Sequence, residues 1–242
     1  MALPQGTIKD YRLYSSSLEE EMELLIYFPD SFSPLYKYTV VIAQDGRDYF
    51  QLGRIGRAAD ELLYNKEIEN IIIVGIPYKN VHDRRSKYHP DGEKQSSYIR
   101  FLAHELVPFL DQSFPTYSMA KGRVLIGDSL GATVSFQAAL KYPHTFGHVI
   151  MQSPYVDSTV MREAVDFADP SLLDIYHVIG TEETDVPTTD GKRQNFIEPN
   201  RELNKLLSER NYSFFYEEFE GEHTWKYWQK DLKRAMKHTL GS

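Results

Sequence analysis

The segment Gly127–Gly131, with the sequence GDSLG, constrains this chain more than any other feature. The apolar run Val124–Ile126 precedes it and the alanine-rich stretch Leu130–Leu140 follows it, which predicts a strand, a tight turn and a helix. Such a turn forces Ser129 into a strained conformation, exposed beside backbone N–H groups and the positive end of a helix. The two glycines remove Cβ atoms that would block so close a turn. We therefore interpret Ser129 as a candidate nucleophile, the alternative being an ordinary solvated serine.

The composition is that of a globular protein. The chain has 242 residues, of which 41% are hydrophobic and 26% are charged, and no repeat or linker divides it. We therefore expect a single domain over residues 1–242. A formal net charge of −8 argues against nonspecific binding to nucleic acid or to anionic membranes. The absence of cysteine excludes disulfides, thiolate metal sites and cysteine nucleophiles.

The first residues lack the basic and apolar regions of a signal peptide, and no stretch approaches the ~20 apolar residues of a transmembrane helix. We therefore expect a cytoplasmic protein without a membrane partner. The oligomeric state stays open, a homodimer being one option.

Strand-like and helix-like segments alternate along the chain. Eight segments have strand character, namely residues 7–14, 21–28, 38–43, 71–76, 124–126, 148–151, 175–179 and 212–219. Helical spacing of apolar side chains occurs in residues 56–66, 96–114, 130–140, 200–209 and 225–240, and Pro108 is expected to kink the second of these. The mostly continuous apolar strands are typical of a parallel sheet covered on both faces. This order predicts an α/β fold, with a mostly parallel, doubly wound sheet of about eight strands and helices on both faces.

A serine nucleophile needs a base, an acid that orients the base, and an oxyanion hole. Of the eight histidines, His223 lies just past the last predicted strand and just before the last predicted helix. A histidine there would lie over the carboxyl edge of the sheet, within reach of Ser129. We predict that His223 is the base, the alternative being a solvated loop histidine.

The acid is expected after the penultimate predicted strand, in a segment that offers three carboxylates. We favour Glu183, because the loop that leaves this strand aims its fourth residue at the histidine. Asp185 is the alternative and Glu182 the third choice. Solvated loop residues, and a Ser–His dyad without an essential acid, are further alternatives.

Two backbone N–H groups are expected to form the oxyanion hole. One belongs to Leu130, immediately after Ser129. The other should come from the loop that follows the strand at residues 38–43, where we choose the N–H of Arg47 and expect Gly46 to allow the turn. An ordinary turn is the alternative there.

Several segments together resemble the putative-esterase family of α/β hydrolases, which contains enterochelin esterases, esterase D-like enzymes and mycolyltransferases. These segments are residues 41–46, 83–90, 101–108, 127–131 and 221–228. The resemblance implies an α/β-hydrolase fold, catalytic roles for Ser129 and His223, and oxyanion donors at Arg47 and Leu130. It leaves the acid open, because the family varies there. Gln44 departs from the apolar or aromatic residue common in the family, which should not harm chemistry that uses backbone groups.

These features together predict a serine carboxylic-ester hydrolase that acts on a small-molecule ester and needs no metal or other cofactor. Substrate contacts are expected from Asp45, from Arg84 and Arg85 for an anionic or catecholate group, and from Trp225 in an acyl or aryl pocket. The alternatives are an acyltransferase on the same fold and a non-catalytic, hydrolase-like binding protein. The physiological ester stays open.

Overall fold

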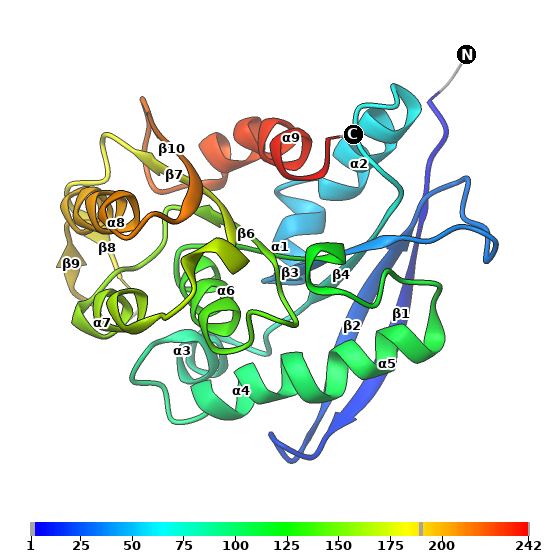
Figure 1. Ribbon diagram of the computed structural model, residues 1–242, viewed down its shortest axis with the longest axis horizontal. Coiled ribbons are helices and arrows are strands. Elements are labelled where there is room, and N and C mark those ends of the chain that lie inside the picture. Colours follow the sequence, from blue (N-terminus) through cyan, green and yellow to red (C-terminus); the bar gives the residue numbers. More distant parts are fainter. Residues whose placement is uncertain (1–2, 189–190, 242) are drawn as a thin grey trace.

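The computed structural model describes residues 3–188 and 191–241. They form an eight-stranded sheet with helices packed against it (Figure 1). The sheet has the strand order β1-β2-β4-β3-β5-β6-β7-β10. The strands are β1 (Thr7–Ser15), β2 (Glu20–Phe28), β3 (Thr39–Gln44), β4 (Ile71–Ile76), β5 (Arg123–Asp128), β6 (His148–Gln152), β7 (Asp174–Gly180) and β10 (Ser213–Phe219). Strand β2 pairs antiparallel with β1 and β4, whereas all other neighbours are parallel. The prediction of a mostly parallel sheet of about eight strands is confirmed.

Alternate side chains of the central strands enter two separate cores. Val40 and Ile42 pack with the helices of one face, and Val41 and Ala43 pack with those of the other. The first face is covered by α3 (Val81–Tyr88), α4 (Gln95–Phe101), α5 (Val107–Ser113), α6 (Leu130–Lys141), α7 (Ser158–Asp166) and α8 (Ile197–Glu209). The second is covered by α1 (Gly46–Gln51), α2 (Ile55–Tyr64) and α9 (Trp225–Leu240) (Figure 1). Both faces are buried, as the apolar strands predict.

The short elements are the π turn Leu102–Leu106, the 3₁₀ turns Ala120–Gly122 and Pro170–Leu172, and the hairpin of β8 (Val186–Pro187) with β9 (Arg193–Gln194). The π turn interrupts the predicted helix of residues 96–114 just before Pro108, which has no N–H to continue the regular pattern. Helices α1, α3 and α7 are not predicted from the sequence. Among the described residues, no helix combines the length and the apolar character needed to cross a bilayer.

The parallel strands bring distant parts of the chain to one edge of the sheet. Strands β3, β5, β7 and β10 all run in the same direction, so the segments that leave their carboxyl ends lie along a common edge. Those segments contain Asp45, Ser129, Glu183 and His223. The fold therefore gathers the candidate residues of the sequence at a single edge.

Candidate active site

Ser129 lies in the sharp turn between β5 and α6, with φ 52° and ψ −125°. L residues rarely adopt this conformation, and such strain is typical of functional sites. A Cβ on Gly127 would lie 2.2 Å from the carbonyl carbon of Gly131, and one on Gly131 would lie 3.1 Å from Cβ of Gln44. The N–H of Ser129 donates to the carbonyl of Gln152 over 2.9 Å, which fixes the turn against β6. The predicted strand, tight turn and helix are present.

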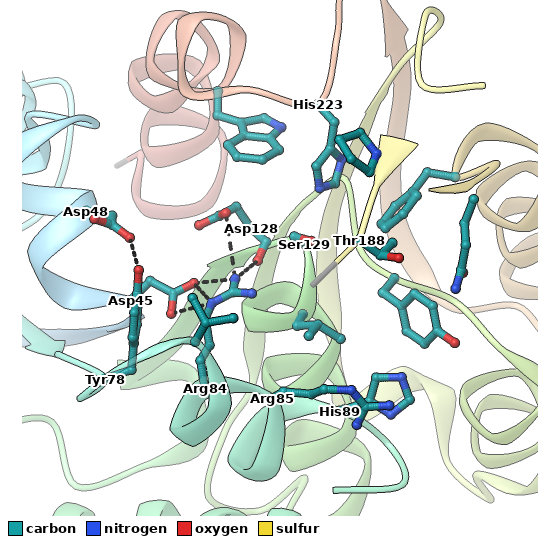
Figure 2. Close-up of a pocket in the computed structure, with 17 residues that line it drawn as sticks. Asp45, Asp48, Tyr78, Arg84, Arg85, His89, Asp128, Ser129, Thr188 and His223 are labelled. Atoms are coloured by element: carbon teal, nitrogen blue, oxygen red, sulfur yellow. Dashed lines mark hydrogen bonds and ion pairs between the residues drawn. The ribbon is translucent and has the colours of Figure 1, made fainter. Parts of the chain in front are cut away.

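His223 comes from the loop between β10 and α9 and lines the same pocket as Ser129 (Figure 2). Its Nδ1 lies 2.6 Å from Oε2 of Glu183, so Nε2 is the ring nitrogen left free for another partner. The ring centroid is 4.4 Å from that of Phe196, and Trp228 packs edge-on against the ring at 4.8 Å. Within the described residues, no hydrogen bond joins the Ser129 hydroxyl to this imidazole; such contacts commonly tighten only when substrate binds.

Glu183 is completely buried in the turn that follows β7. Its Oε1 accepts hydrogen bonds from the N–H of Gly180 at 2.9 Å and from the hydroxyl of Ser153 at 2.6 Å, while Oε2 faces His223. Burying a carboxylate is costly unless hydrogen bonds replace its water shell. Three donors do so here, and they fix the orientation of both oxygens.

The other two carboxylates of this turn lie in solvent. Asp185 is exposed and pairs with Nε of Arg193 at 2.8 Å, and Glu182 is exposed as well. Of the three acids considered from the sequence, Glu183 is therefore the one that the fold brings to His223.

The segments expected to supply oxyanion donors lie at the starts of two helices. Leu130 is the first residue of α6 and Arg47 is the second of α1, positions whose N–H groups have no partner within the helix. A Cβ on Gly46 would lie 2.4 Å from the carbonyl carbon of Gly75, so the turn packs directly against β4. The Arg47 side chain does not line the pocket and pairs with Glu23 at 2.7 Å.

One wall of the pocket is an ion-pair cluster around Arg84, which is carried by α3 (Figure 2). Nε and Nη2 of Arg84 contact the two oxygens of Asp45 at 2.9 and 2.5 Å, and Nη2 lies 4.0 Å from Oδ2 of Asp128. Oδ1 of Asp128 is buried and finds no hydrogen-bond partner among the residues that the structure describes. Burial, reinforced by the charge of Asp45, raises the pKa of Asp128 well above its usual range.

A second wall consists of rings and of Arg85 (Figure 2). The His89 and Tyr155 rings are 5.0 Å apart, and Arg85 pairs with Asp91 at 3.0 Å. Burial and the Arg85 charge lower the pKa of His89. In residues 3–188 and 191–241, no group of three or more His, Cys, Asp or Glu side chains is placed to hold a metal ion.

Trp225 does not line this pocket, in contrast to the expected substrate contact. It opens α9, and its ring packs edge-on against Tyr49 at 4.8 Å and Trp228 at 5.6 Å. Contact with Tyr49 directs the Trp225 ring toward α1, and Trp228, three residues later in α9, lines the pocket instead. Asp45, Arg84 and Arg85 do line it.

The family model for "Putative esterase" matches residues 15–239. The chain belongs to this family. Among curated relatives, this family member is 55% identical over 240 residues to the uncharacterized protein YjcH of Bacillus subtilis, covering 99% of this chain and 100% of that protein. It is 29% identical over 136 residues to the iron(III) salmochelin esterase of Escherichia coli O6:H1, covering 54% of this chain and 32% of that enzyme.

Solved esterases share the fold of this family member. The enterobactin esterase of Shigella flexneri, solved with enterobactin, has a TM-score of 0.83 and 18% identity, with 98% of this chain and 60% of that chain covered. A ferulic acid esterase has a TM-score of 0.82 and 16% identity, with 98% of each chain covered. The predicted α/β-hydrolase-type fold is confirmed.

Ser153 and Trp228 contact the Glu183–His223 pair of this esterase-family site, yet neither is predicted as a site residue from the sequence. Ser153 directly follows β6, whose carboxyl end lies at the same sheet edge as those of β5 and β7. The rule that sites form beyond the carboxyl ends of parallel strands was the signal that could have identified it.

Proposed function

We propose that the protein is a serine carboxylesterase with Ser129 as nucleophile, His223 as base and Glu183 as the orienting acid. The observation that carries the proposal is the 2.6 Å contact of the buried Glu183 with Nδ1 of His223, in a pocket shared with the strained Ser129. The membership in the esterase family supports the same reaction class.

In the acylation step, the Ser129 hydroxyl attacks the ester carbonyl carbon and passes its proton to Nε2 of His223. The resulting imidazolium is stabilised by Oε2 of Glu183, which contacts Nδ1. The negative charge on the carbonyl oxygen is stabilised by the N–H groups of Leu130 and Arg47, at about 3 kcal/mol for each donor. His223 then protonates the leaving alcohol as the C–O bond breaks.

In the deacylation step, His223 takes a proton from water, whose oxygen attacks the carbonyl carbon of the acyl-Ser129 ester. The same oxyanion donors stabilise the second tetrahedral intermediate. Collapse of this intermediate returns the proton to Ser129 and releases the carboxylic acid. One ester and one water thus give one acid and one alcohol.

Esters that carry an aromatic group fit the pocket best. The rings of Tyr155 and Phe196 lie 6.0 Å apart and both line the pocket together with Ser129, so they offer an apolar surface beside the nucleophile. The similarity to a ferulic acid esterase and to a salmochelin esterase supports the same class of ester. Arg84 is paired with Asp45, whereas Arg85, on the second wall, is about one-third exposed and pairs with the more exposed Asp91.

The test is a Ser129→Ala variant assayed with p-nitrophenyl acetate and with a phenolic-acid ester. Turnover should fall by about 10⁴-fold or more. A fluorophosphonate probe should label the wild-type protein at Ser129 and leave the variant unlabelled. Ser135→Ala is the matched control and should keep wild-type turnover, because it removes a buried hydroxyl of α6 that has no hydrogen-bond partner in the described part of the chain. Wild-type turnover in Ser129→Ala would overturn the assignment.

A further inference from the structure

The hydroxyl of Ser153 connects a tryptophan to the buried acid of the site. Ser153 is fully buried and follows β6 directly. Its Oγ lies 2.6 Å from Oε1 of Glu183, and Nε1 of Trp228 lies 2.9 Å from the same Oγ. The three groups form a continuous hydrogen-bonded chain that ends at the carboxylate facing His223.

The direction of this chain follows from the chemistry of its first member. An indole N–H can only donate a hydrogen bond, so Oγ of Ser153 accepts from Trp228. The single hydroxyl proton of Ser153 is then directed to Oε1 of Glu183. Because each hydrogen bond in a chain polarises the next, the indole strengthens the donor that the carboxylate receives.

The backbone at Ser153 would suit a glycine better than a serine. Ser153 has φ 50°, a left-handed conformation in which a glycine would be less strained than a serine. The side chain does not line the pocket and therefore has no route to the substrate. Its one polar atom is committed to Trp228 and Glu183.

We propose that Ser153 and Trp228 are positioning residues, which hold the Glu183 carboxylate with Oε2 against Nδ1 of His223. The proposal rests on the function proposed above. Trp228 acts twice, because its ring also packs edge-on against the imidazole at 4.8 Å. Loss of either residue should lower the rate of proton transfer through His223. Loss of Ser153 should leave the binding of the ester unchanged.

The first test compares Ser153→Ala with the matched control Ser135→Ala, which also removes one buried serine hydroxyl. In Ser153→Ala, kcat should fall by about 10- to 100-fold, the factor carried by one hydrogen bond to a charged group. KM should stay within about twofold of the wild-type value, because only the positioning of the acid changes. The control should keep both constants. Wild-type kcat in Ser153→Ala would overturn the proposal.

Ser153→Gly separates the hydroxyl from the stability of the fold. Glycine adopts φ 50° without strain, so this variant should unfold at a higher temperature than Ser153→Ala. Its kcat should nevertheless be as low as that of Ser153→Ala, because both lack the hydroxyl. Recovery of kcat in step with thermal stability would show a purely structural role and contradict the proposal.

Trp228→Phe keeps an aromatic ring beside His223 and removes the N–H. We expect kcat to fall by about 3- to 10-fold, less than in Ser153→Ala, because the hydroxyl can still donate to Glu183. The double variant Trp228→Phe/Ser153→Ala should have nearly the same kcat as Ser153→Ala, because the N–H acts through the hydroxyl. Any further loss should come only from the altered ring. Losses that multiply fully would show that the two residues act independently.

A readout without turnover keeps this proposal distinct from the proposed function. The Nδ1 proton between His223 and Glu183 should give a low-field proton NMR signal in the wild-type protein, assigned by its absence in His223→Gln. The signal should broaden or disappear in Ser153→Ala and persist in Ser135→Ala. An unchanged signal in Ser153→Ala would overturn the positioning role. If the signals behave as expected but the protein hydrolyses no ester, the proposed esterase function fails and the positioning role stands.

Discussion

Glu183 and Asp45 are buried carboxylates on two sides of the site, and different groups hold them. Glu183 receives its hydrogen bonds from neutral donors, the Gly180 N–H and the Ser153 hydroxyl, and from the imidazole of His223. Asp45 is instead held in a two-pronged ion pair with Arg84. The first carboxylate faces a group that can gain and lose a proton, and the second faces one that cannot.

This difference assigns different tasks to the two sides of the pocket. An imidazole beside a firmly oriented carboxylate can accept the serine proton, because the charge it gains is stabilised at once. A guanidinium stays charged throughout, so Arg84 can hold α3 and the turn at Asp45 in place but cannot transfer protons. Chemistry should therefore depend on the Glu183 side and stability on the Arg84 side.

The largest expected effect on catalysis is that of Glu183→Gln. The substitution keeps the size of the side chain but replaces a charged acceptor with an amide, so the imidazole loses both its orientation and the stabilisation of its charge. We expect kcat to fall by about 10³- to 10⁴-fold with p-nitrophenyl acetate, with a small change in KM.

Asp185→Asn is the matched control for that variant, because Asp185 lies two residues away in the same turn and pairs with Arg193 in solvent. It should keep wild-type kcat. An equal loss of kcat in the two variants would show that Glu183 is not the acid that orients His223. The two sides of the pocket would then not differ in their roles.

The second prediction concerns stability on the Arg84 side. Arg84→Met leaves the buried Asp45 without its cation and should lower the free energy of unfolding by about 3–5 kcal/mol, measured by urea unfolding. Asp45→Asn should lower the free energy of unfolding by less, because Arg84 still has Asp128 within 4.0 Å. The reverse order of the two losses would show that Asp45 is not the main partner of Arg84.

The third prediction is a pH dependence that arises from Asp128. Its pKa is raised in the folded state by burial and by the nearby Asp45, so the folded protein holds this proton more tightly than the unfolded chain. The stability that Asp128 contributes is complete below about pH 3.9, the ordinary aspartate value, and is lost as pH rises through the folded pKa.

Asp128→Asn removes this titration. The variant should therefore gain thermal stability relative to wild type as pH rises from about 4 toward neutral, and the gain should level off above the folded pKa. Asp166→Asn, at an exposed aspartate, should give a curve parallel to that of wild type. A pH-independent difference for Asp128→Asn would show that its carboxyl titrates alike in the folded and unfolded states.

The parts of the molecule that the sequence predicts are those with local signals. The eight strands are visible as apolar runs or, for the first two and the last, as alternating segments, and Ser129 lies between a strand and a helix that both have clear patterns. His223 and Glu183 are found from their positions directly after strands, because parallel strands end at one edge of the sheet.

Helix α3 shows why other parts are not predicted. Its buried residues include Lys87, whose ammonium group pairs with Asp83 at 2.9 Å and with Glu20 at 2.5 Å. A helix whose buried face is charged has no apolar periodicity, so the pattern that identifies the other helices is missing. Ser153 escapes prediction for a related reason, since its partners Glu183 and Trp228 are distant in sequence.

The smallest expected effect is that of Arg85→Gln. Arg85 is about one-third exposed and its partner Asp91 is more exposed still, so their ion pair contributes at most about 1 kcal/mol to stability. For a neutral ester, kcat and KM should stay within about twofold of wild type. For an ester that carries a free carboxylate, KM alone should rise by about 3- to 5-fold, because a partly solvated charge attracts an anion weakly. If KM for the anionic ester does not change, the expected contact between Arg85 and an anionic substrate is wrong.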